Sequence, residues 1–231
     1  MRLLVWPELC SRLLWRVLLC CFGLLVSCGG GLTDEEQGVM TWARKNGIQI
    51  NDWRAGEVST AFSVDAWKAE GRAKPNAEEI IWRLLGRNDP HIEPILLVGA
   101  LAAVGTERSV ELLSDYTRDP WIVMRMHALW ALGHIGLPEA FVVVADRFVH
   151  DEDTNCRANA ALALGQIGDP RGIELIEKAL ADIDLKEKAL EEVCMRGGKA
   201  EDEMELRHAK FLRRFFEMAL NDLRTRASTN K

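Results

Sequence analysis

The side chains that most often carry catalysis or bind metals are scattered along this chain. His150 is followed at once by the acidic residues Asp151, Glu152 and Asp153, and imidazole and carboxylate groups at this spacing could bind a metal ion loosely. The segment falls between two predicted helices, where charged side chains are normally solvated. We therefore predict no metal site there and no cofactor. The remaining histidines lie elsewhere, at His91, His127, His134 and His208.

No arrangement of residues typical of an enzyme is evident. Serines are scarce in the central part of the chain, and none has a histidine and an aspartate at a plausible spacing. The glycines follow predicted helices and not strands, so the sequence contains neither a phosphate-binding glycine loop nor a nucleophile elbow. The chain is therefore predicted not to be an enzyme.

The composition favours a folded protein that does not bind nucleic acid. The chain has 231 residues, of which 48% are hydrophobic, and this is enough for one sizeable core with room for an appendage. The formal net charge is −6. An electrostatic contact with nucleic acid requires a basic face, and the composition gives no sign of one.

The first 28 residues have the pattern of an export signal. A basic region precedes residues 17–33, which carry no charge, and the first part of this stretch is nearly all apolar. This order is typical of a secretory signal, and the apolar part is too short for a comfortable membrane span. We therefore predict that residues 1–27 are a signal peptide and are removed. Its basic residues are Arg2, Arg12 and Arg16.

The end of this segment, Leu25-Val26-Ser27-Cys28, resembles the lipobox of bacterial lipoproteins. In such proteins the cysteine thiol accepts the lipid, and a small residue before it allows the peptidase to fit. The resemblance implies that Cys28 becomes the N-terminus and carries fatty acyl chains such as palmitate. Residues 28–32 would then form a short tether, and two or three acyl chains would hold the protein stably at a membrane.

The residue after the lipidated cysteine helps to select the membrane in proteins of this kind. Gly29 stands there and not an aspartate, which implies the periplasmic face of the outer membrane in a bacterium with two membranes. The alternatives are an ordinary signal peptide, or an uncleaved anchor that leaves the protein facing the cytoplasm. After cleavage only Cys156 and Cys194 remain besides Cys28. We predict buried structural thiols there, with a disulfide between them as the alternative.

The middle of the chain repeats itself. Gly105, Gly136 and Gly168 close three matching apolar segments and stand 31 and 32 residues apart. Each glycine is followed by a polar or proline-containing turn and a second apolar-periodic segment, so each unit is predicted to be two helices joined at a glycine in the left-handed conformation. A lone helix pair cannot bury its apolar face, and the units must therefore stack. The expected core residues are Leu101, Leu132, Leu164, Val104, Ile135 and Ile167.

The third unit, ALALGQIGDPRGIELIEKAL, closely resembles the short HEAT-like repeats of phycobilisome lyases and bacterial scaffolds. The resemblance covers residues 89–181 and implies an all-α solenoid, but it does not specify a function. A HEAT-like, lyase-type enzyme is one alternative, and predicted export argues against it because bilin attachment in those systems is cytoplasmic. The preferred interpretation is a lipid-anchored scaffold or adaptor for protein–protein interaction at the cell envelope.

Helices are also predicted on both sides of the repeats. Residues 33–88 form an N-terminal flank, with helices at 60–70 and 77–85. Residues 182–231 form a C-terminal cap made of two helices, 185–196 and 203–226, separated by a pair of glycines.

The second repeat has apolar residues where its neighbours have polar ones. Val142 stands where both neighbouring repeats have a glutamate, and Ala145 stands where they have a serine and a glutamate. Trp121 stands where the next repeat has Asp153. We predict that Trp121, Val142 and Ala145 form an exposed patch that binds a protein partner. The alternative is that a flanking helix covers them.

Two further repeat positions carry polar side chains. Arg125 and Arg157 are equivalent in successive repeats and are expected to form a structural ladder with carboxylates such as Asp119 and Asp151. His134 stands where the other repeats have an alanine and a glutamine, and it is predicted to lie on the surface.

Overall fold

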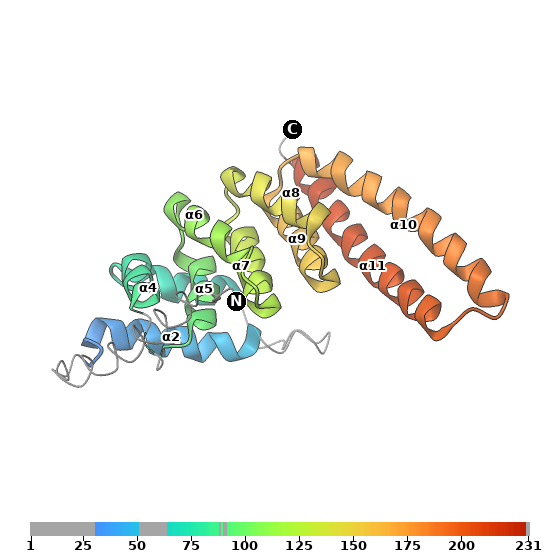
Figure 1. Ribbon diagram of the computed structural model, residues 1–231. Helices are drawn as coiled ribbons and strands as arrows, with labels where there is room; N and C mark the ends of the chain where they lie inside the picture. The colour runs from blue at the N-terminus through green and yellow to red at the C-terminus, as the bar shows by residue number, and fades with distance from the viewer. Residues whose placement is uncertain (1–30, 51–63, 88, 90–91, 230–231) are drawn as a thin grey trace, which may run out of the picture. The chain divides into compact units, whose positions relative to one another are not determined.

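The computed structural model describes residues 31–50, 64–87, 89 and 92–229, which form helices joined by turns and loops, with no strand among them (Figure 1). The predicted all-α fold is confirmed. The helices are α2 (Asp34–Ile50), α3 (Val64–Arg72), α4 (Ala77–Gly86), α5 (Pro94–Val104), α6 (Glu107–Tyr116), α7 (Ile122–Ile135), the 3₁₀ turn η2 (Pro138–Ala140), α8 (Phe141–His150), α9 (Thr154–Ile167), α10 (Arg171–Met195) and α11 (Ala200–Thr229).

The first helices of the repeats stack on one another and form the core. Helix α5 contacts α7, and α7 contacts α9, so each is apolar on nearly all sides. Small residues allow a close approach: a Cβ added to Gly133 of α7 would lie 2.8 Å from the Cα of Ala163 in α9. The predicted core leucines are fully buried, whereas Val104, Ile135 and Ile167 are half-buried.

The second helices pack against this stack with one apolar stripe each. Helix α6 contacts α7, and α8 contacts α9. In α8 the buried residues are Phe141, Val144 and Phe148, spaced three and four residues apart as on one helix face. The rest of α8 faces away from the stack, and Val142 and Val149 are exposed there.

Two of the three predicted left-handed glycines are confirmed. Gly136 and Gly168 have φ angles of 71° and 77° and end α7 and α9. The prediction for Gly105 is wrong, because its φ is −66° and its backbone is extended. Close packing explains the glycine there: an added Cβ would lie 2.7 Å from Cδ1 of Ile135 and 2.6 Å from the carbonyl oxygen of Leu101.

The predicted break before residue 185 is also wrong. Helix α10 runs without interruption from Arg171 to Met195, because no glycine or proline follows Gly172 within it and buried residues continue from Ile176 to Ile183. The predicted boundary at residue 181 therefore lies inside a helix. Helix α11 turns back along α10 and also contacts α9 (Figure 1), so it occupies the place that the first helix of a fourth repeat would take.

Within the N-terminal flank an ion pair joins α2 to the end of α4, and a row of tryptophans connects the flank to α7 of the second repeat. The carboxylate of Glu36 in α2 is fully buried and accepts hydrogen bonds of 2.7 and 3.1 Å from Arg87. The rings of Trp42 and Trp67 stack at 5.4 Å, and Trp67 lies 5.8 Å from Trp130 of α7. Helices α3 and α4 correspond to the two predicted flank helices.

Candidate functional site

A buried ion pair joins the second repeat to the third. The guanidinium of Arg125 donates two hydrogen bonds of 3.1 Å to the carboxylate of Asp151 and a third to the backbone carbonyl of Asp119. The side chains of Arg125 and Asp151 are 7% and 1% exposed. Asp151 also accepts a hydrogen bond from the amide of Asp153. The predicted pairing of Arg125 with Asp151 is confirmed. Asp119 also binds Arg125, but through its backbone carbonyl and not through its carboxylate.

The equivalent arginine of the next repeat has no such partner. The side chain of Arg157 makes no hydrogen bond or ion pair with any residue that the structure describes, and its Nε is buried. The position equivalent to Asp151 is Ile183, which lies within α10 and not in a loop. The predicted ladder is therefore wrong at its second step. Comparing position 183 with position 151 in the repeat alignment would have revealed the missing carboxylate.

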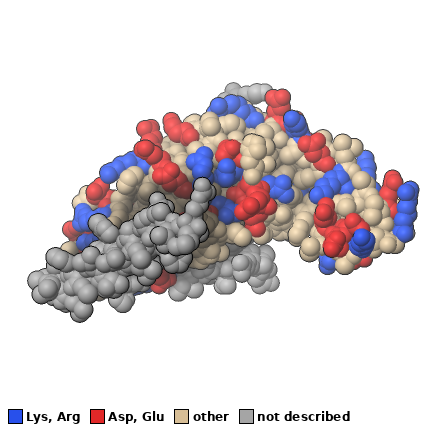
Figure 2. Space-filling model, in the orientation of Figure 1, with Lys and Arg blue, Asp and Glu red and all other residues tan. Residues whose placement is uncertain are grey.

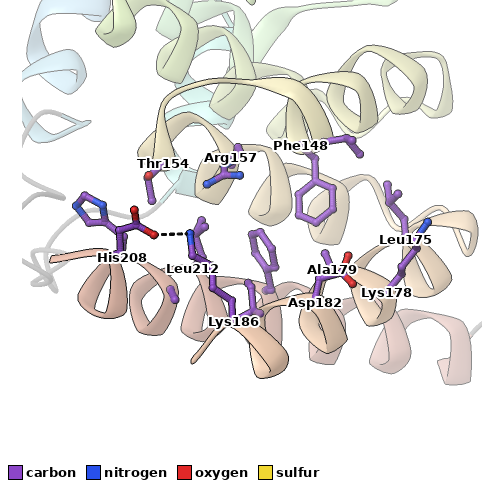
Figure 3. Close-up of a pocket in the computed structure, with 15 residues that line it drawn as sticks. Phe148, Thr154, Arg157, Leu175, Lys178, Ala179, Asp182, Lys186, His208 and Leu212 are labelled. Carbon is purple, nitrogen blue, oxygen red and sulfur yellow. Dashed lines mark ion pairs between the residues drawn. The ribbon is translucent and has the colours of Figure 1, made fainter. Parts of the chain in front are cut away.

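The guanidinium of Arg157 lies in the wall of a cavity of about 600 Å³ (Figure 3). Helices α8, α9, α10 and α11 each contribute side chains to it. The rings of Phe148 and Phe216 lie 4.7 Å apart, and both contribute to the lining, together with the aliphatic residues Leu175, Ala179, Ile183, Ala209 and Leu212. A ligand in this cavity would meet one arginine among mainly apolar walls.

The other charged groups of the cavity are partly neutralised. Lys186 forms an ion pair of 3.0 Å with Glu205 across the α10–α11 pair, drawn as the dashed line in Figure 3. Lys178 and Asp182 also belong to the lining, and neither has an ion-pair partner among the described residues. The cavity therefore offers Arg157 and Lys178 as cations, opposed by one carboxylate, and it suits an anionic group on an apolar carrier.

The predicted partner patch is divided between a loop and a helix. Val142 and Ala145 lie one turn apart on α8, where Val142 is 66% exposed and Ala145 is half-buried. Trp121 precedes α7 and is 52% exposed. Two further exposed apolar residues lie nearby in the sequence, Ile122 at the start of α7 and Val149 in α8. The comparison of repeat sequences does not identify either of them. Binding of a partner at this patch stays a prediction.

His134 is not the surface residue that the repeat alignment predicted. Its ring is half-buried, with its centroid 4.2 Å from that of Trp130, and its Nδ1 lies 3.0 Å from the carbonyl oxygen of Trp130. Lys68 of α3 donates a 2.6 Å hydrogen bond to the carbonyl oxygen of His134. Burial of the ring, together with the Lys68 charge, lowers the pKa of His134 to about 4.

This pKa predicts a loss of stability in mild acid. Because the pKa of His134 is lower in the folded state than the ordinary value of 6.5, the unfolded chain takes up the proton first as the pH falls. We expect the free energy of unfolding to decrease by about 2 kcal/mol between pH 6.5 and pH 4, since the ring is only half-buried. Denaturation at a series of pH values measures this, and His134→Gln should flatten that part of the profile. A profile unchanged by His134→Gln but flattened by the control His150→Gln would contradict the assignment.

The acidic loop and the two cysteines are further candidate groups in the described part of the chain. No cluster of three or more metal-binding side chains occurs there, and in the acidic loop Asp153 accepts hydrogen bonds from the first amides of α9. Cys156 is buried as predicted, whereas Cys194 is only half-buried. Both are free thiols, so the alternative of a disulfide is wrong. Burial raises the pKa of Cys156 to about 12, which makes this thiol unreactive.

The predicted membrane attachment involves residues that the structure does not describe. Cys28 lies outside the described residues, as does the predicted signal peptide. Among the helices that are described, none combines the length and the apolar character needed to cross a bilayer. On the face shown in Figure 2, acidic and basic side chains are interspersed over these helices.

Part of the chain matches a known protein family. No curated protein matches the chain. Residues 122–193 match the family of HEAT repeats, a stretch that begins with α7 and ends near the end of α10. This stretch is therefore similar to HEAT repeats, and it lies within an all-α solenoid.

Proposed function

We propose that this protein is a lipid-anchored HEAT-repeat scaffold that binds a protein partner at the bacterial cell envelope. HEAT repeats typically serve as protein-interaction scaffolds, since their stacked helices present extended surfaces. The observation that carries the proposal is the position of Cys28 at the end of an uncharged apolar segment, a few residues before α2 begins at Asp34. A lipid on Cys28 would hold the first helix close to the headgroups. Gly29 favours the outer membrane as the destination.

The anchor is tested by the mass of the N-terminal peptide from membrane fractions. We expect a diacylated or triacylated peptide that begins at Cys28, and we expect Cys28→Ser to abolish the modification and move the protein to the soluble fraction, because no acyl chain remains. Cys194→Ser is the control and should stay in the membrane. An unmodified N-terminus, or retention of residues 1–27, would reject the lipoprotein proposal and restore the ordinary signal peptide or the uncleaved anchor.

The proposed partner surface is tested by a charge on α8. Val142→Glu should leave the melting temperature unchanged, because this side chain is 66% exposed, and it should reduce at least about tenfold the amount of any protein that co-purifies from the envelope. Leu185→Glu is a matched control, since Leu185 is 69% exposed on α10, far along the sequence from the patch. A lowered melting temperature for Val142→Glu would show that the position is covered, and equal co-purification with both variants would remove the patch from the proposal.

A further inference from the structure

We propose that the cavity between α8, α9, α10 and α11 binds an aspartate or glutamate side chain of a partner polypeptide, with Arg157 as the group that recognises the carboxylate. This inference deepens the proposed scaffold function by assigning a chemical feature of the partner. The cavity is lined by α8 as well as by the third repeat, but its lining does not include Trp121, Val142 or Ala145 of the apolar patch.

The preceding repeat shows which group the arginine position normally binds. Arg125 is held by Asp151, whose two carboxylate oxygens accept hydrogen bonds from Nε and Nη2. Arg157 occupies the same repeat position on α9, and its Nε is buried without a partner. The guanidinium has a planar set of donors that matches a carboxylate in two-point geometry. The chain therefore contains its own template for the missing ligand, a peptide-borne aspartate.

The chain cannot supply this aspartate from the equivalent position. In the second repeat the helix ends at His150 and Asp151 begins a loop, whereas in the third repeat α10 continues and places Ile183 there. The acidic residues in the cavity lining are Asp182 and Glu205. Glu205 is already paired with Lys186 at 3.0 Å, and Asp182 makes no ion pair with Arg157 in the described structure. No carboxylate of the described residues pairs with Arg157, and we therefore assign this role to a partner polypeptide.

The remaining walls define the neighbours of that carboxylate. Phe148, Phe216 and Leu212 give the cavity an apolar side, while Lys178 adds a second positive charge on α10. A cavity of about 600 Å³ accepts a few side chains and not a whole helix. A short segment with an acidic residue beside an apolar one fits these walls, and it would give the guanidinium of Arg157 the carboxylate that it lacks in the described structure.

The probe is a capped peptide copied from the chain's own template, residues 148–153, Phe-Val-His-Asp-Glu-Asp. It is titrated into the ¹⁵N-labelled full chain in detergent micelles, and binding is followed at the Nε–H signal of Arg157, which is identified by its absence in Arg157→Lys. We expect a dissociation constant on the order of 1 mM. Arg157→Gln should weaken binding at least about tenfold, and Arg157→Lys should fall between the two, because lysine keeps the charge but loses the planar donors.

Three controls separate the carboxylate from other causes of binding. A peptide with Asp151→Asn, Glu152→Gln and Asp153→Asn should bind at least about tenfold more weakly. Arg118→Gln removes an exposed arginine outside the cavity lining and should leave binding unchanged. Asp182→Asn removes a like charge from the wall and should bind the peptide at least as tightly.

Several results would overturn the proposal. These are equal binding by Arg157→Gln, equal binding of the uncharged peptide, no binding up to about 10 mM, or weaker binding by Asp182→Asn. Sodium acetate that binds as tightly as the peptide would show a site for small anions instead. None of these results depends on acylation, so they leave the proposed anchor at Cys28 to its own test.

Discussion

Asp151→Asn is expected to lower the free energy of unfolding by about 4 kcal/mol. The substitution keeps the shape of the side chain but removes the charge that compensates Arg125, and both side chains are almost completely buried. A buried guanidinium without its counter-ion cannot recover its hydration inside the protein, so breaking the pair costs more than the pair contributes. The loss is measured by urea denaturation at neutral pH.

The same experiment contains two informative comparisons. Glu191→Gln breaks the ion pair between Glu191 and Lys210, and both of these side chains are about half-exposed. This substitution should change the free energy of unfolding little, because water screens exposed pairs. The double variant Arg125→Met with Asp151→Asn should regain much of the loss, since no charge then remains buried. A small effect of Asp151→Asn alone, similar to that of Glu191→Gln, would show that the pair is solvated.

Gly133→Ala is expected to lower the free energy of unfolding by about 3 kcal/mol, although alanine is the better helix former. Its Cβ would lie 2.8 Å from the Cα and 2.9 Å from the Cβ of Ala163. These are backbone and near-backbone atoms that cannot turn aside, so α7 and α9 must separate along their contact. The expected strain exceeds the gain in helix propensity of about 1 kcal/mol.

A second glycine provides the matched control. Gly86 ends α4, and a Cβ added there would meet nothing within 4 Å, so Gly86→Ala should leave stability equal or slightly higher. Thermal denaturation of both variants beside the parent protein measures the difference. A Gly133→Ala protein as stable as Gly86→Ala would mean that the first helices are not packed as closely as described.

The repeat stack was predictable because its physical constraints are visible in single residues. Gly136 and Gly168 adopt the left-handed conformation that few other residues tolerate, and Leu132 and Leu164 recur at the fully buried position of the stack. Residue type, spacing and packing agree at these positions. Gly105 has the same sequence context but a different cause, close contact with Ile135, and sequence comparison cannot separate these two reasons for a glycine.

The features that escaped prediction depend on residues far apart in the chain. The variable repeat equivalents of His134 predict a surface position, yet Trp67 and Lys68 of the flank contact this part of α7. Helix α10 was divided because a repeat was expected to end at residue 181, whereas its apolar spacing simply continues. The alignment gives the average repeat, and the terminal repeats differ because they contact other partners.

The candidate sites divide in the same way. The exposed residues of α8 could be selected from the sequence because each replaced a polar residue of the neighbouring repeats. The cavity at Arg157 could not, because it is defined by α11, which begins more than forty residues later in the chain. The one sequence signal for it, an isoleucine at position 183, becomes meaningful only when Arg125 and Asp151 are seen to pair.

The continuity of helix α10 also affects how the C-terminal end of the protein unfolds. The first part of this helix belongs to the third repeat and the last part to the terminal pair with α11. In most repeat proteins the end units fray separately, since each contacts only its neighbours. Here the backbone hydrogen bonds of one helix run through both parts, and α11 in addition lies against α9. We therefore expect the last repeat and the terminal pair to open and close as a single cooperative unit.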